Sequence, residues 1–224
     1  MNPRELLREL VSLQGATVVD VGCGDGELVR WLAGQGAHAI GVEVGEEPLA
    51  RARAAARVAD ERFEQGGAEG LPLPDASADA ATLIQSLHHV PVELMDQALE
   101  EVARVLRPGG LVFVQEPLAE GDQFEVLLPL DDETRVRRAA QAALARLPDA
   151  LTVERTETFD LRVRHASFEA LRDRILLNDA ARTERFPAVE DELRARFARL
   201  ATPEDGGFVL VQPTKVDLLR RTGT

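Results

Sequence analysis

The chain has 224 residues, of which 45% are hydrophobic, and a formal net charge of -13. This length accommodates one domain with a full core rather than two ordinary domains. So acidic a chain repels a phosphate backbone, and we expect no nucleic-acid partner. No apolar run approaches the roughly 18 residues of a membrane-spanning helix, so we expect no membrane partner either. The start MNPRELLREL lacks the pattern of a secretory signal and Cys23 is the single cysteine, which favours the cytoplasm.

The first half of the chain alternates short apolar runs with helical patterns. Asn2 and Pro3, followed by Glu5, mark a helix start, and the sequence RPGG at 107–110 closes a later helix. Strands and helices that alternate in this way predict a parallel sheet covered on both faces. We expect strands at 17–21, 37–44, 78–84 and from 111, and helices from 28, at 48–58 and at 94–106.

After Pro117 this alternation ends. Pro213 interrupts the last strand pattern of the chain, which predicts an edge strand or a bulged one. The expected elements are helices at 134–147, 167–178 and 189–200, and strands at 151–165 and 208–219.

A glycine-rich turn follows the first predicted strand, in the sequence VVDVGCGDGELVRWL. Asp20 stands at the strand end, and Gly22, Gly24 and Gly26 alternate in the turn. Glycine lets the backbone approach a ligand closely, and the helix that follows offers free N–H groups. Glu43 ends the next strand about 20 residues later, where a carboxylate can accept both hydroxyls of a ribose. Together these residues predict a site for a nucleoside-like ligand.

The spacing of the glycines distinguishes between ligands. A dinucleotide fingerprint G-x-G-x-x-G needs glycine at position 27, which is Glu27 here. The observed G-x-G-x-G resembles motif I of the class I S-adenosylmethionine-dependent methyltransferases. The resemblance continues through GVEVGEEPLARAR, GGAEGLPLPDASADAATLIQSLHHV and EEVARVLRPGGLVFVQEP, and so covers about residues 15–117. Within that family the chain looks like the small-molecule enzymes of the type 11 group.

The resemblance implies S-adenosylmethionine as cofactor and a role for each matching residue. Asp20 and the glycine backbone would hold the methionine moiety, and Glu43 the ribose. Gly67 stands where many members carry an aspartate at the adenine, so Glu69 or the backbone would replace that contact. The residues implied in cofactor binding are Asp20, Gly22, Cys23, Gly24, Gly26, Glu43, Val44, Ala68, Glu69, Gln85 and Ser86.

Three residues are candidates for catalysis. His88 and His89 are the histidines of the motif region, and Glu116 follows the fifth strand at the same crevice. Either histidine could act as a general base, or the pair could shape its loop by hydrogen bonding. No metal site is predicted, because the two histidines are adjacent and no Cys/His pairs surround them.

The function implied is methyl transfer by in-line displacement to a small-molecule acceptor. The sequence QSLHH after the fourth strand lacks the Asn/Asp-Pro-Pro-Tyr motif of amino-methyltransferases of DNA, and Cys23 is misplaced for a cytosine-carbon enzyme. Two alternatives stay open: a nicotinamide-dependent oxidoreductase, which Glu27 disfavours, and a catalytically inactive binding module.

The resemblance also implies the architecture. We expect an α/β, Rossmann-like, doubly wound sheet of seven mostly parallel strands, with an antiparallel edge strand and a helical cap in the C-terminal half. Residues 1–117 would form the cofactor-binding core, 118–205 a cap with the acceptor pocket, and 206–224 the final strand. All of these belong to one methyltransferase domain, a monomer or homodimer.

Overall fold

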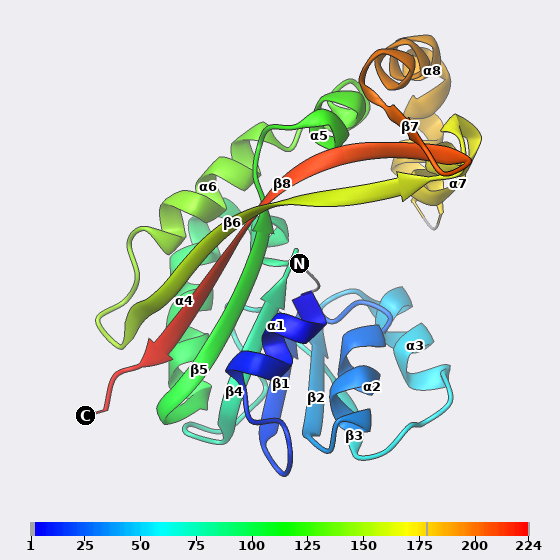
Figure 1. Ribbon diagram of the computed structural model, residues 1–224. Coiled ribbons are helices and arrows are strands. Elements are labelled where there is room, and N and C mark those ends of the chain that lie inside the picture. Colours follow the sequence, from blue (N-terminus) through cyan, green and yellow to red (C-terminus); the bar gives the residue numbers. More distant parts are fainter. Residues whose placement is uncertain (1–2, 178, 224) are drawn as a thin grey trace. The chain divides into compact units, whose positions relative to one another are not determined.

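The computed structural model describes residues 3–177 and 179–223 (Figure 1). The predicted helix cap at Asn2 and the predicted helix end at Asn178 lie outside these residues. The elements in chain order are α1 (Pro3–Leu10), β1 (Thr17–Val21), α2 (Glu27–Gly34), β2 (His38–Glu43), α3 (Glu46–Ala54), β3 (Glu61–Gln65), β4 (Ala78–Ile84), α4 (Met95–Val105), β5 (Leu106–Pro117), α5 (Asp122–Leu127), α6 (Thr134–Leu144), β6 (Leu151–His165), α7 (Phe168–Leu176), α8 (Ala180–Leu200), β7 (Thr202–Glu204) and β8 (Gly207–Arg221).

The strands form one sheet in the order β3-β2-β1-β4-β5-β8-β6, with β7 paired to β8. The pairs β1–β2, β1–β4, β2–β3 and β4–β5 are all parallel. The carboxyl ends of β1 to β5 therefore share one edge of the sheet, where open α/β sheets bind their ligands. β8 runs opposite to its neighbours β5 and β6 (Figure 1).

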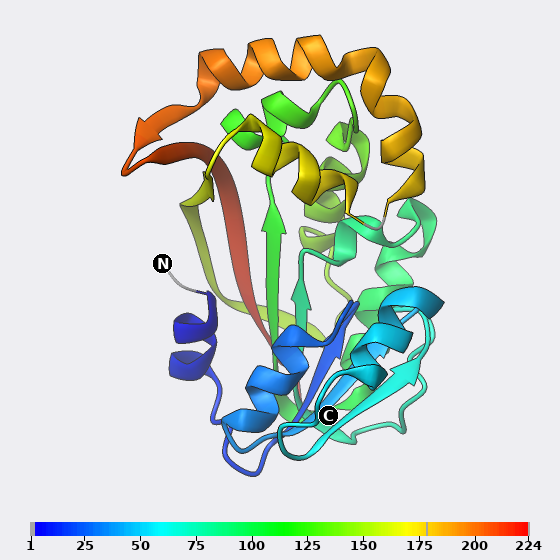
Figure 2. The same ribbon diagram turned by 90° about the vertical axis from the view of Figure 1, so that its right-hand side faces the viewer.

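The chain divides into two compact units. Of the described residues, the first unit contains 3–116, 139–157 and 215–223. Within it, α1 and α2 lie on one side of the sheet and α4 on the other (Figure 2). The buried face of α4 recurs at helical spacing, as in Met95, Leu99 and Val102, and packs on the strands. The predicted parallel sheet covered on both faces is confirmed.

The second unit contains residues 117–138, 158–177 and 179–214 of the described chain and has an apolar core of its own. Arg137 is buried in this unit and donates to the carbonyl of Leu118 at 3.0 Å and to Gln212 Oε1 at 3.1 Å. Its guanidinium also pairs with Glu133. The core side chains are Val126, Leu130, Phe168, Leu171, Phe186, Leu193, Phe197 and Leu210.

In the part of the chain that the structure describes, the sheet has eight strands rather than the predicted seven. The additional β7 forms a hairpin with β8 through Asp205 and Gly206, which both have positive φ, at 44° and 77°. Asp-Gly is the preferred dipeptide of such two-residue turns, and it was the available sequence signal. β8, which contains Pro213, lies between β5 and β6. Of the two alternatives predicted for the Pro213 strand, an edge strand or a bulged one, the edge strand is therefore wrong.

Other expectations on local structure need correction. The RPGG segment 107–110 does not close α4 but lies inside β5, where the register with β4 shifts between Ala78 and Ala80. The helix predicted at 189–200 begins at Ala180, and Pro187 lies inside it. α5 was not predicted at all. Among the described residues, no helix combines the length and the hydropathy needed to cross a bilayer.

Candidate functional site

A cavity of about 580 Å³ opens at the carboxyl ends of β1, β2 and β4 in the first unit. Its size is in the range of small-molecule and cofactor sites. The residues that line it are Val21, Gly22, Glu43, Val44, Gly66, Gly67, Ala68, Glu69, Gln85, Ser86, His89, Val90 and Pro91.

The glycine loop after β1 forms one wall. The backbone N–H groups of Gly22 and Cys23 donate to the carbonyl of Val42 at 2.8 and 3.1 Å, which fixes the loop to β2. Gly22 has a φ of +76°, and a Cβ at this position would lie 2.7 Å from the Cβ of Ser86. Glycine is therefore required here both by backbone conformation and by the close approach of the chain after β4.

Glu43 is half-buried at the end of β2, and its carboxylate organises the same loop. One oxygen accepts the backbone N–H of Gly24 at 2.8 Å, and the other accepts that of Gly45 at 2.8 Å. Each carboxylate oxygen has a second lone pair, so both can still accept a hydrogen bond from a ligand hydroxyl.

Asp20 at the end of β1 and Cys23 in the glycine loop are buried and do not line the cavity. Asp20 is 4% exposed, and Thr82 Oγ1 donates to its carboxylate at 2.7 Å. Burial raises the pKa of Asp20 to about 6, against the opposing effect of the Thr82 hydrogen bond and with a smaller upward contribution from Glu43. Burial likewise raises the pKa of the Cys23 thiol to about 12, which disfavours the thiolate that a nucleophilic cysteine needs.

The segments after β2 and β3 form the opposite wall. Val44 is 69% exposed, which is high for an apolar side chain, and it lines the cavity together with Ala68 and Glu69. Arg104 of α4 fixes the segment that follows Glu69, because its guanidinium donates to the carbonyls of Leu71 and Leu73 at 3.0 and 2.9 Å. This wall is therefore fixed by α4.

Gln85 and Ser86 follow β4 and carry two unusual features. Gln85 has a φ of +53°, a conformation that non-glycine residues rarely adopt and that is found more often at functional sites. The Ser86 hydroxyl is buried and has no hydrogen-bond partner among the described residues. A buried hydroxyl without a partner is destabilising, so its presence at a cavity wall points to a ligand group that completes it.

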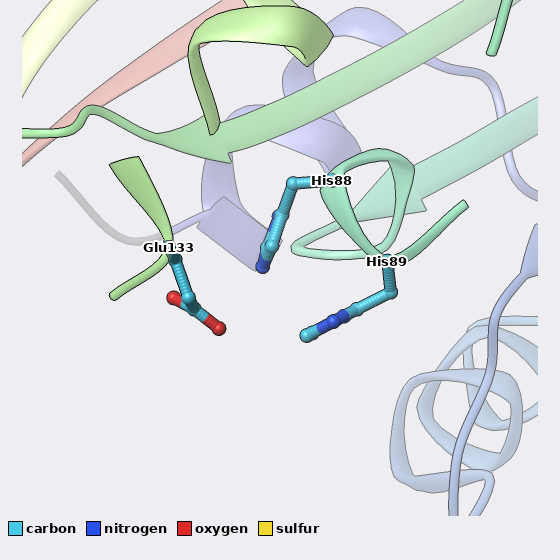
Figure 3. Close-up of side chains that lie close together, drawn as sticks. All are labelled: His88, His89 and Glu133. Carbon is cyan, nitrogen blue, oxygen red and sulfur yellow. The ribbon is translucent and has the colours of Figure 1, made fainter. Parts of the chain in front are cut away.

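His88 and Glu116 form a buried pair behind Ser86. His88 Nδ1 bonds to one oxygen of Glu116, and the other oxygen accepts the backbone N–H groups of Ser86 and Leu87 at 3.1 and 2.8 Å. Both side chains are under 5% exposed. The ring of His89, which lines the cavity, lies next to that of His88, with the ring centroids 4.1 Å apart (Figure 3).

The structure thus brings most of the predicted residues to one cavity. Those that line it are Gly22, Glu43, Val44, Ala68, Glu69, Gln85, Ser86 and His89, whereas Asp20, Cys23, Gly24, Gly26, His88 and Glu116 do not. Sequence reasoning missed Val21, Gly66, Val90 and Pro91 as lining residues. Pro91, directly after the histidine pair, was a turn signal that could have extended the predicted wall.

These residues suit S-adenosylmethionine. The carboxylates of Glu43 and Glu69 line the cavity and can accept hydrogen bonds from hydroxyl and amino groups, and their charge favours a cationic ligand. The buried Ser86 hydroxyl has no hydrogen-bond partner among the described residues, so it is free to bond to a ligand. A ligand with polar and charged ends and a flat aromatic base matches such a cavity.

Comparisons with known proteins agree with this assignment. The family described as "Methyltransferase domain" matches residues 19–114. The 27-O-demethylrifamycin SV methyltransferase of Amycolatopsis mediterranei is 36% identical over 139 residues, 58% of this chain and 48% of that protein. The ubiquinone biosynthesis O-methyltransferase of Aeromonas salmonicida is 37% identical over 106 residues, 46% of this chain and 43% of that protein. The chain thus spans about half the length of these curated relatives.

Solved structures show the same fold. The YcgJ protein from Bacillus subtilis superposes with a TM-score of 0.70 at 21% sequence identity, and the alignment covers 99% of this chain and 98% of that one. The segment 19–114 therefore belongs by its sequence to the methyltransferase domain family, and the solved structure shows the same fold over the whole chain.

Proposed function

We propose that the protein transfers a methyl group from S-adenosylmethionine to an oxygen of a small-molecule acceptor. The observation that carries the choice of oxygen is the His88–Glu116 pair, because a hydroxyl acceptor must lose its proton and a base must take it. Two of the relatives described above are named for methylation of oxygen. A cytoplasmic location, which the single cysteine favours, stays part of this proposal.

Glu116 determines which nitrogen of His88 can act as the base. Its carboxylate accepts a hydrogen bond, so Nδ1 of His88 carries the proton and Nε2 keeps its lone pair. In the proposal the acceptor lies against His89 at the edge of the cavity. It reaches past that ring to the adjacent ring of His88, and the hydroxyl proton passes to Nε2 of His88. Glu116 then stabilises the imidazolium that forms, as a carboxylate partner does for a catalytic histidine.

The cavity residues supply binding and orientation. S-adenosylmethionine, when bound, supplies a methyl group that is already activated on a sulfonium. Glu43 would accept the ribose hydroxyls, and the Gly22 backbone with the Ser86 hydroxyl would hold the amino-acid end. Alignment of the reacting atoms and exclusion of water are then the main tasks left to the protein.

Glu116→Gln tests the proposal sharply. The amide oxygen can still accept the N–H groups of Ser86 and Leu87, while the amide nitrogen would donate to His88 Nδ1 and move the ring proton to Nε2. We expect kcat to fall about 100-fold or more at unchanged affinity for S-adenosylhomocysteine. The kcat of His88→Gln should fall by a similar factor, and the kcat of the double variant should fall no further than that of either single variant. Mass spectrometry measures methyl transfer to a panel of phenols, alcohols, carboxylic acids and amines.

Two results would contradict the proposal. One is transfer to amines or thiols with hydroxyl compounds inert. The other is a Glu116→Gln variant that retains the wild-type kcat, which would mean that the His88–Glu116 pair only stabilises the turn after β4.

We further propose that the segment 118–205 forms the cap and determines the acceptor. Its support is that the second unit has an independent apolar core, and that long segments near the ligand edge of α/β sheets commonly carry specificity. α6 carries three arginines that could pair with a carboxylate of the acceptor: Arg135, Arg137 and Arg138. Arg137 already pairs with Glu133, so we propose Arg135 and Arg138 for this role. Hydrogen exchange with S-adenosylhomocysteine and an accepted substrate should show new protection within 118–205. Protection confined to the glycine loop would overturn the cap assignment.

A further inference from the structure

The turn after β4 begins with a strained residue. In the described part of the chain, three residues other than glycine have a positive φ: Ala76, Gln85 and Asp205. Ala76 and Asp205 are exposed residues of turns outside the cavity lining, whereas Gln85, with a φ of +53°, lies in the cavity wall. The Gln85 side chain is exposed, so its own packing does not account for a backbone that is costly for a residue with a Cβ.

The conformation of Gln85 shapes a small anion-binding site. The next residue, Ser86, has a φ of -126° and a ψ of -31°, on the right-handed side. Successive residues of opposite hand direct consecutive backbone N–H groups into one concavity, a nest that accepts an anion. Here the N–H groups of Ser86 and Leu87 meet at a single oxygen of Glu116, at 3.1 and 2.8 Å. The carboxylate of Glu116 therefore occupies this nest.

The nest fixes Glu116 in the position from which it binds His88. One carboxylate oxygen lies in the nest, and the other bonds to His88 Nδ1. Glu116 is 1% exposed, so the two N–H groups replace the water that a buried carboxylate has lost.

The change of hand occurs at the last contact between β4 and β5. The N–H of Gln85 itself still donates to the carbonyl of Gln115 in β5, at 2.8 Å. An extended Gln85 would continue β4 and direct the following N–H groups along the strand rather than toward Glu116. The left-handed conformation at this one residue is therefore what forms the nest.

We propose that Gln85 is a positioning residue for the base of the reaction, and that it acts through its backbone rather than through its amide. Its strained conformation forms the nest, the nest fixes Glu116, and Glu116 orients His88. The inference rests on the proposed function, in which His88 takes the proton of the acceptor. Strain at a functional site is thus offset by the hydrogen bonds that it makes available to Glu116.

The variants Gln85→Gly, Gln85→Ala and Gln85→Val separate the backbone of this residue from its side chain. All three lack the amide, but glycine adopts a positive φ freely, alanine at a cost, and β-branched valine at the highest cost. Amide hydrogen exchange measured by NMR reports on the nest without turnover. We expect the amides of Ser86 and Leu87 to exchange at similar rates in the wild type, Gln85→Gly and Gln85→Ala, and at least 10-fold faster in Gln85→Val.

The glycine variant keeps the test informative if the valine variant does not fold. Because glycine removes the strain, Gln85→Gly should unfold at a higher urea concentration than Gln85→Ala, with the exchange of the Ser86 and Leu87 amides unchanged. A lower urea midpoint for Gln85→Gly than for Gln85→Ala would contradict the strain on which the proposal depends.

The value of kcat tests the link to the reaction. It is measured at saturating S-adenosylmethionine with a hydroxyl compound of the panel above that the wild type methylates. We expect kcat of Gln85→Val to be at least 10-fold below that of Gln85→Ala, and kcat of Gln85→Gly to equal or exceed that of Gln85→Ala. Ala76→Val is the matched control, because Ala76 has a φ of 48° in the turn before β4, outside the cavity lining. This control should lose stability and keep the wild-type kcat.

The failure of this inference is distinct from that of the proposed function. Equal amide exchange, or equal kcat, in Gln85→Ala and Gln85→Val would overturn the role of Gln85 alone. A wild-type kcat in Glu116→Gln would overturn the proposed base, and the positioning role with it.

Discussion

The carboxylate of Glu43 at the end of β2 accepts the backbone N–H of Gly24 in the loop after β1, at 2.8 Å. The residue predicted to hold the ribose thus also holds the glycine loop in place. Loop position and ribose recognition are therefore coupled through one side chain, and a substitution at Glu43 should affect both.

Glu43→Ala should weaken binding of S-adenosylhomocysteine by about 1.5 to 3 kcal/mol, roughly 10- to 150-fold, because charged acceptors are lost from the cavity. Glu43→Gln keeps an oxygen that can accept the N–H of Gly24, so it should lose less affinity for S-adenosylhomocysteine than Glu43→Ala. His88→Ala serves as control and should bind nearly as the wild type, since His88 does not line the cavity. Calorimetry measures all three, and equal affinities for Glu43→Ala and the wild type would remove the ribose assignment.

Gly22→Ala and Gly24→Ala form a matched pair within one loop. Both residues have positive φ, which costs a non-glycine residue about 1 to 2 kcal/mol. A Cβ on Gly22 would also meet Ser86 at 2.7 Å, whereas one on Gly24 meets nothing within 4 Å. Gly22→Ala should therefore lower the free energy of unfolding by about 1 to 3 kcal/mol more than Gly24→Ala, as measured by urea denaturation. Similar losses would show that the loop adapts at Gly22.

Ser86→Ala should raise the stability of the free protein while weakening the cofactor complex. The variant removes a buried hydroxyl without a partner, so we expect the free energy of unfolding to rise by about 1 kcal/mol. If the ligand forms a hydrogen bond with the Ser86 hydroxyl, the affinity of Ser86→Ala for S-adenosylhomocysteine should be about 5-fold lower than that of the wild type. Thermal unfolding with and without ligand separates the two effects. A variant destabilised without ligand would mean that Ser86 has a structural partner.

Asp20 should make folding stability depend on pH. Its pKa is raised from 3.8 to about 6, mainly by burial, so the folded state holds this proton more tightly than the unfolded state. The contribution of Asp20 is therefore most favourable below about pH 4 and is lost as the pH rises to about 6, by up to roughly 3 kcal/mol. Asp20→Asn keeps an oxygen that accepts the hydrogen bond from Thr82, but it has no carboxyl group that titrates.

The measurement is the difference in unfolding free energy between the wild type and Asp20→Asn from pH 4 to pH 7. Carboxylates whose pKa is lowered, such as Asp79 and Glu101, make stability depend on pH in the opposite direction. Their contributions are the same in both proteins and cancel in the difference. We expect the wild type to lose stability relative to the variant as the pH rises. A constant difference would mean that Asp20 titrates in its ordinary range.

The glycine loop and Glu43 could be predicted from spacing alone, because strand, turn and helix lengths determine which residues meet at the sheet edge. The contacts among them could not. Glu116 belongs to β5 and His88 to the turn after β4, and the parallel pairing of β4 with β5 brings the two residues close together. The sequence does not determine the side-chain rotamers on which their hydrogen bond depends. The position of Glu69 likewise depends on the absence of a side chain at Gly67.

Local signals failed where tertiary structure overrides them. The helix predicted at 189–200 is longer than expected: α8 begins at Ala180, where Asp179 accepts the N–H of Arg182 as a cap, and Pro187 lies inside it. Proline usually disfavours the interior of a helix because it lacks an N–H group, so sequence alone favoured the shorter helix. β3 has the half-buried Phe63 but no apolar run, and only its pairing with β2 identifies it as a strand.

The central claim is that the cavity at the ends of β1, β2 and β4 binds S-adenosylmethionine, and calorimetry with S-adenosylhomocysteine tests it most directly. We expect one site per chain with a dissociation constant in the micromolar range, and a matching rise in thermal stability as the ligand concentration increases. No heat of binding and no thermal stabilisation at millimolar ligand would contradict the claim.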